Sequence, residues 1–135
     1  LARWVASPYA REWSHAETLH RELDLLLPIG AAPRDLVSGQ IDLCLHDGRG
    51  WRLYDFKTSH VPPGPDDAAL LREYSFQLGV YALAAEAWWG TPITEIGLVL
   101  LRPTVRVVPL PWDDARRSVM WERLKAAVAA ARAAS

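Results

Sequence analysis

Two aspartates and a lysine are the residues of this sequence whose types and spacing best fit catalytic chemistry. Asp42 lies in one strand-like run, and Asp55 and Lys57 lie in the next. Hard divalent ions choose oxygen ligands, and Mg²⁺ commonly takes one or two carboxylates while keeping several waters. A lysine beside such an ion can orient or deprotonate a water, or neutralise charge that develops on a phosphate. The three side chains therefore predict a Mg²⁺ or Mn²⁺ site with an adjacent ammonium group.

The register of a predicted hairpin brings these side chains together. A four-residue turn, Asp47 to Gly50, joins the two strands. This loop length pairs Asp42 with Asp55 and Gln40 with Lys57, and directly opposed residues share one face of an antiparallel pair. Opposed carboxylates repel each other, so solvent, a shared proton or a bound cation must offset the repulsion. The other face of the hairpin is apolar and is predicted to face the core: Ile41, Leu43, Tyr54 and Phe56.

The same spacing has a simpler interpretation. Asp55 and Lys57 can form a solvated ion pair at the edge of a sheet, with Asp42 unrelated to it. A hairpin loop with an odd number of residues would also move Asp42 to the opposite face. The presence of Asp42 on the same face of the hairpin as Asp55 and Lys57 is what favours a cation site over this alternative.

Helices and strands alternate along the chain around these residues. We expect, in order, a helix over about 8–20, strands over 23–29, 37–46 and 51–58, a proline-rich loop over 59–65, a long helix from Asp66 or Asp67 to Gly90, a hairpin of strands 95–101 and 105–110, and a final helix capped by Asp113. Tyr74, Gln77 and Tyr81 share one face of the long helix. That face either packs in the core or lies over the hairpin, where Gln77 would hold a carboxylate, Lys57 or a DNA phosphate.

Length, charge and composition limit the class of protein to which the chain can belong. The length of 135 residues favours one domain, and a net charge of −1 does not by itself indicate nucleic-acid binding. A single cysteine excludes an internal disulfide framework and an iron–sulfur cluster held within this chain. There is no signal peptide and no apolar run long enough to cross a bilayer, so we expect a cytoplasmic location and no membrane partner. The first residue is leucine, which suggests a piece of a longer protein.

Three segments, in this order, resemble the nuclease domain of RecB/AddA-type helicase–nucleases of the PD-(D/E)XK superfamily: Gly39–Asp42, Leu53–Thr58 and Tyr74–Ala82. The resemblance runs from about residue 22 to 101. It implies a restriction-endonuclease-like α/β fold, a mixed sheet of about five strands flanked by helices. It also implies one nuclease-like domain over residues 1–135, as a C-terminal fragment of a longer helicase–nuclease that lacks the N-terminal helix of that family.

The resemblance also implies roles for individual residues. Asp42 and Asp55 would be metal ligands together with the backbone carbonyl of Phe56, and Lys57 would be the catalytic lysine. Supporting or DNA-contacting positions would be Tyr74, the Gln-x-x-x-Tyr pair Gln77 and Tyr81, and Glu22 just ahead of the first strand. Members of this family carry a further upstream ligand, commonly histidine. His15 and His20 are the candidates here, and neither is assigned.

The reaction that the resemblance implies is Mg²⁺- or Mn²⁺-dependent hydrolysis of DNA phosphodiester bonds. The implied partners are DNA, a fused or associated helicase, and a partner subunit of a double-strand-break repair complex. Two alternatives stay open. One is a non-catalytic module of the same fold that guides DNA or braces a partner subunit, and the other is a stand-alone nuclease of the same superfamily.

Overall fold

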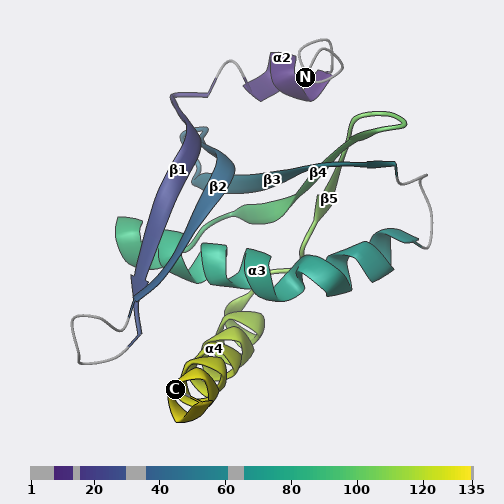
Figure 1. Ribbon diagram of the computed structural model, residues 1–135. Coiled ribbons are helices and arrows are strands. Elements are labelled where there is room, and N and C mark those ends of the chain that lie inside the picture. Colours follow the sequence, from purple (N-terminus) through teal and green to yellow (C-terminus); the bar gives the residue numbers. More distant parts are fainter. Residues whose placement is uncertain (1–7, 14–15, 30–35, 61–65, 135) are drawn as a thin grey trace.

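The computed structural model describes residues 8–13, 16–29, 36–60 and 66–134. Its elements, in chain order, are α2 (Pro8–Trp13), β1 (Thr18–Pro28), β2 (Leu36–His46), β3 (Trp51–His60), α3 (Asp66–Trp89), β4 (Glu95–Arg102), β5 (Arg106–Pro109) and α4 (Asp114–Ala134). The strands form one sheet in the order β1-β2-β3-β4-β5. Neighbouring strands are antiparallel except β3 and β4, which are parallel and are connected through α3. The predicted α/β fold with a mixed five-stranded sheet is confirmed (Figure 1).

Helices lie on both faces of the sheet (Figure 1). The larger apolar cluster lies beneath α3 and α4 and includes Leu53, Leu98 and Met120. The smaller cluster lies on the opposite face, where the ring of Trp13 on α2 stacks on Tyr54 with the centroids 4.2 Å apart. β4 is buried on both faces over most of its length, which agrees with its unbroken apolar sequence. None of the described helices is long and apolar enough to cross a membrane.

Local signals in the sequence set the ends of the two long helices. α3 ends where Gly90 adopts a φ of 69° and its N–H donates to the carbonyl of Glu86. α4 begins after Asp113, whose carboxylate accepts the N–H of Arg116 at 2.8 Å. The start of α3 at Asp66 and the caps at Gly90 and Asp113 are as predicted.

The first helix is shorter than predicted. It ends at Trp13, and Thr18 already belongs to β1, so the predicted helix over 8–20 is wrong beyond its first turns. The apolar spacing in this segment matched a helical period, but Thr18 to Arg21 pair with β2 from His46 to Leu43. Tertiary pairing overrides local periodicity here. His20 and Glu22 therefore lie within β1, and His15 lies outside the described residues.

The alternation of faces along β2 changes at Asp42. Ile41 packs in the cluster beneath α3, whereas Leu43, two residues on, packs on the opposite face. In a regular strand these two would share a face, and the prediction that they do is wrong. On the neighbouring strand β1, Glu22 has a φ of 53°. The β1–β2 ladder pairs Arg21 with Leu43 and Leu23 with Ile41, but it lacks the pair Glu22–Asp42 between them. The local backbone irregularity thus turns both strands at the height of Asp42.

Gly39 lets α3 lie close to β2. A Cβ on Gly39 would stand 2.5 Å from Cε1 of Tyr81. We expect Gly39→Ala to lower the free energy of unfolding by about 1–3 kcal/mol, since overpacking a core forces side chains and backbone to shift. Urea denaturation measures this effect. In a Tyr81→Leu background the cost should largely disappear, and an unchanged cost there would contradict the proposed clash.

Candidate active site

The candidate site lies where β2 and β3 separate. The two strands pair from His46–Trp51 to Leu43–Tyr54, with the register that the turn length predicts. Beyond that point β2 continues along β1, and β3 continues along β4 (Figure 1). We call this divergence the strand fork. Asp42 and Asp55 are the next residues on the two strands, so they stand at its opening.

The predicted pairing of Gln40 with Lys57 is wrong, because the ladder between β2 and β3 has ended before it reaches them. Gln40 is paired with Asp24 of β1 instead, and its side-chain amide donates to the Asp24 carboxylate at 3.1 Å. The widening fork leaves Lys57 beside α3 and β4 rather than opposite β2.

The carboxylate of Asp42 bridges the fork. Its Oδ2 accepts a hydrogen bond from the backbone N–H of Phe56 at 2.8 Å. In a regular antiparallel ladder a backbone carbonyl of the neighbouring strand would accept such a bond. The same carboxyl group also lies within hydrogen-bonding reach of the Asp55 side chain. The two carboxyl groups are therefore neighbours, although the ladder between β2 and β3 ends at Leu43 and Tyr54 and does not include the predicted pairing of Asp42 with Asp55.

Asp55 is the buried acid of the site, with 7% of its surface exposed. Its Oδ2 lies 3.0 Å from Nζ of Lys57. Burial, and secondly the neighbouring Asp42 carboxyl, raise the pKa of Asp55 from 3.8 to about 6, although the Lys57 ammonium acts in the opposite direction. Ionising Asp55 in this position therefore costs more free energy than ionising a carboxyl group in water.

Lys57 is held between an anion and a ring. Its Nζ lies 3.0 Å from the Asp55 carboxylate and 4.0 Å from the ring centroid of Tyr74 on α3. A cation over an aromatic face gains about 0.5–1 kcal/mol at an exposed site and more when desolvated. Asp55 and Tyr74 together fix where the ammonium group stands.

Lysine NMR tests the contact between Lys57 and Tyr74. The chain has two lysines, Lys57 and Lys125, so ¹³C-labelled lysine gives two ε-methylene signals, and Lys125→Arg assigns them. We expect the ring to shift the Lys57 signal upfield. Tyr74→Leu should move that signal to the random-coil position, and Tyr74→Phe should retain the shift because the ring remains. A Lys57 signal that is indifferent to Tyr74→Leu would contradict the contact.

The other two residues of the predicted helix face form a pair of their own. Gln77 donates its side-chain amide to the hydroxyl of Tyr81 at 2.8 Å, and the ring of Tyr81 lies against Gly39. The structure therefore brings Tyr74 to the charged cluster, and Gln77, which the sequence offered for a contact with a carboxylate or Lys57, bonds Tyr81 instead. Position along α3 distinguishes the two residues. Tyr74 is about one turn closer than Gln77 to the N-terminus of α3, which is the end connected to β3.

No third protein ligand joins the two carboxylates within the described part of the chain. Glu22 is at the level of Asp42 on β1, and its side chain is exposed. His20 lies near Trp51, with ring centroids 6.0 Å apart. Across the described residues, no three His, Cys, Asp or Glu side chains are grouped as a metal site. Cys44 is buried, and burial raises the pKa of its thiol to about 12, so it is not a thiolate at neutral pH.

The donor set fits a hard divalent cation. Asp42 and Asp55 supply carboxylate oxygens at one point, and a cation there would offset the cost of burying the ionised Asp55 carboxylate beside Asp42, which raises the pKa of Asp55. Two protein carboxylates with the remaining positions filled by water is an arrangement that Mg²⁺ commonly accepts. The same cluster keeps an ammonium group beside the carboxylates, which suits chemistry on an anionic substrate.

Comparisons with known proteins show the family of the chain. Residues 1–133 match the family model of the PD-(D/E)XK nuclease superfamily. The chain is 33% identical over 119 residues to an ATP-dependent helicase/nuclease protein of Pelotomaculum thermopropionicum, covering 79% of this chain and 9% of that protein. It is 35% identical over 91 residues to an ATP-dependent helicase/nuclease protein of Desulfitobacterium hafniense, covering 63% and 6%. The chain thus spans less than a tenth of the length of these curated relatives.

Two solved structures share the fold. One is a protein of Eubacterium rectale named for a proposed exonuclease activity, with a TM-score of 0.54, 14% identity, and coverage of 92% of this chain and 47% of that one. The other is the crystal structure of SSO0001, with a TM-score of 0.51, 19% identity, and coverage of 77% and 48%. At these identities the likeness concerns the architecture of the sheet and its helices.

Proposed function

Because the chain belongs to the PD-(D/E)XK nuclease superfamily, we propose that it hydrolyses DNA phosphodiester bonds with a divalent cation held by Asp42 and Asp55. The observation that supports this most directly is the meeting of two carboxyl groups and the Lys57 ammonium at the strand fork. An inactive module of the same fold has no need to keep two acids whose proximity is unfavourable.

Each residue has a distinct role in this proposal. Asp42 and Asp55, with the carbonyl oxygen of Phe56, would hold Mg²⁺ or Mn²⁺, and this cation would supply Lewis-acid stabilisation of charge on the phosphate. Lys57 donates hydrogen bonds to the attacking water or to a non-bridging phosphate oxygen. Tyr74 keeps the ammonium in place. The oxygen of the water forms the new bond to phosphorus, and the bond from phosphorus to the leaving sugar oxygen breaks. The attacking water gives a proton to solvent, and the leaving sugar oxygen takes a proton from solvent to become a hydroxyl group.

The wider context is also a proposal. The similar helicase/nuclease proteins are more than ten times longer than the matched segment. We place this chain as the exonuclease module of a cytoplasmic helicase–nuclease that repairs double-strand breaks, with a helicase and a partner subunit beside it. The net charge of −1 supports delivery of DNA by such a neighbour, because a domain that captures DNA unaided usually carries a basic surface.

The two lysines of the chain provide the test. In the full-length protein, Lys57→Met should lower the rate of nucleotide release from linear DNA with Mg²⁺ by roughly 10²–10³-fold, since an ammonium aimed at developing charge contributes on that scale. Lys125→Met is the matched control, because Lys125 lies on α4 and bonds Glu122 at 3.2 Å. A chelator should stop cleavage. Equal activity of the two variants would remove the role proposed for Lys57, and the absence of Mg²⁺-dependent cleavage by the unmodified protein would favour the non-catalytic alternative.

A further inference from the structure

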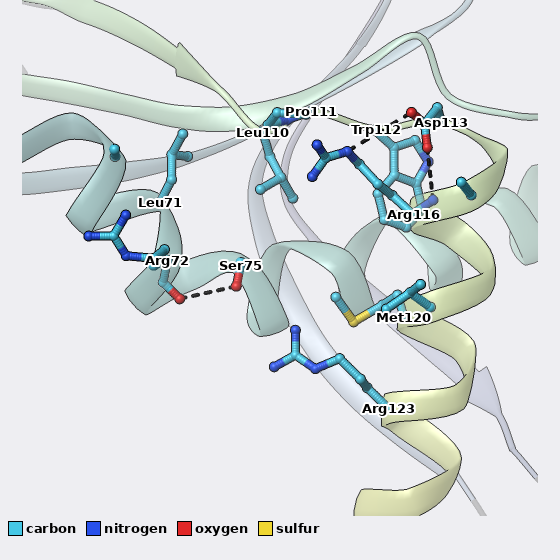
Figure 2. A pocket seen from close by; sticks show the side chains of 13 residues that line it. Leu71, Arg72, Ser75, Leu110, Pro111, Trp112, Asp113, Arg116, Met120 and Arg123 are labelled. Carbon is cyan, nitrogen blue, oxygen red and sulfur yellow. Dashed lines mark hydrogen bonds and ion pairs between the residues drawn. The ribbon is translucent and has the colours of Figure 1, made fainter. Parts of the chain in front are cut away.

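A groove lies between α3 and α4 (Figure 2), and none of the strand-fork residues lines it. It encloses about 720 Å³. Arg72 and Ser75 of α3 line it, whereas Tyr74 between them turns to Lys57, so the groove and the fork lie on different sides of α3. The two sites can therefore be changed separately.

The floor of this groove is apolar. Leu71 of α3, Leu110 ahead of α4, and Val119 and Met120 of α4 line it (Figure 2). Val119 is 60% exposed, and it is one of few large apolar side chains that the described surface leaves so open. Covering such a floor removes apolar area from water and stabilises a complex.

Arginines stand on both walls of the groove. Arg72 comes from α3, and Arg116 and Arg123 come from α4 (Figure 2). The one acid among the lining residues is Asp113, which already accepts the N–H of Arg116 as the cap of α4 and lies 4.0 Å from the Arg116 side chain. Arg123 contacts the ring of Phe76 at 5.2 Å rather than a carboxylate. The rim is thus positive on a chain whose net charge is −1.

We propose that this arginine groove binds an amphipathic helix of a partner protein, apolar along one stripe and acidic on both flanks. Arg116 and Arg123 are seven residues apart, roughly 10 Å along α4, which is also the spacing of carboxylates two turns apart on a bound helix. Arg72 on the facing wall meets the other flank. The apolar floor favours a protein over nucleic acid, because a phosphate backbone would lie uncompensated against Val119 and Met120.

The source of that helix rests on the proposed function: it would be the partner subunit that accompanies this domain. A photo-crosslinking residue, benzoylphenylalanine, placed at position 119 of the full-length complex identifies the occupant by mass spectrometry. We expect crosslinks to a segment with apolar residues at helical spacing between carboxylates. Reversing Arg72, Arg116 and Arg123 to Glu should lower the crosslink yield by roughly tenfold or more, since each rim charge contributes modestly.

Matched variants separate the outcomes. Reversal of three exposed arginines elsewhere, Arg21, Arg49 and Arg102, makes the same charge change and should leave the yield as in the unmodified complex. Lys57→Met should also leave it unchanged, so a failed nuclease proposal and a failed groove proposal give different results. Crosslinks to DNA, crosslinks to a segment without acidic flanks, no crosslinks, or a yield that is insensitive to reversal of the groove arginines would overturn the proposal.

Discussion

Asp42→Asn should lower the rate of DNA cleavage by roughly 10²–10³-fold while leaving the fold intact. The asparagine oxygen can still accept the N–H of Phe56 that Asp42 accepts at 2.8 Å, so the strand fork keeps its bridge. The substitution removes only the negative charge that we propose to hold the cation. Single-turnover cleavage of linear DNA by the full-length protein measures the rate, and circular dichroism of the same preparation checks the fold.

Asp24→Asn is the matched control for this substitution. Asp24 lies on β1 and accepts the amide of Gln40 at 3.1 Å, a bond that an asparagine oxygen can also accept. Its side chain is exposed and takes no part in the fork. We expect the cleavage rate of this variant to stay near that of the unmodified protein. Similar rates for Asp42→Asn and Asp24→Asn would show that the Asp42 charge has no role in the reaction.

The meeting of the two acids could be predicted from the sequence because turn length fixes register. The four residues between His46 and Trp51 set the pairing that the structure confirms down to Leu43 and Tyr54. The end of that ladder could not be predicted. It depends on β2 following β1 while β3 follows β4, which is a property of the whole sheet.

The irregular backbone conformation at Glu22 could not be predicted from the sequence either. A positive φ is uncommon at a residue other than glycine, and the sequence predicts Glu22 just ahead of the first strand rather than within it. The result was a wrong face for Ile41, which the turn of β2 at Asp42 moves beneath α3. Regular alternation is thus least reliable at the place where the candidate site is formed.

The helix over the site shows what periodicity can and cannot specify. Spacing placed Tyr74, Gln77 and Tyr81 on one face of α3. In the structure Tyr74 lies over Lys57, and the exposed Gln77 donates to Tyr81, whose ring lies against Gly39. Which of them reaches Lys57 depends on the position of α3 along its own axis relative to the strand fork. That distance follows from the connection after β3 and from packing against β1 and β2, neither of which has a local signature.

Asp55→Asn should stabilise the metal-free chain at neutral pH, by an amount that grows as the pH rises from about 4 to about 6. The folded chain raises the pKa of Asp55 from 3.8 to about 6, so the folded state holds this proton more tightly than the unfolded state does. Between those values ionisation therefore lowers the free energy of unfolding, by up to about 3 kcal/mol above pH 6. Asparagine carries no such penalty.

Urea denaturation with and without Mg²⁺ at pH 4.5 and pH 7.5 measures this difference, with Asp24→Asn as the variant that should retain the behaviour of the unmodified chain. Mg²⁺ should raise the stability of the unmodified chain at pH 7.5 by mass action, and it should leave Asp55→Asn nearly unchanged. A variant that is less stable than the unmodified chain at both pH values would mean that the Lys57 ion pair outweighs burial and Asp42. The carboxyl pair would then be a structural contact that needs no cation, and the reason for assigning it to metal binding would be lost.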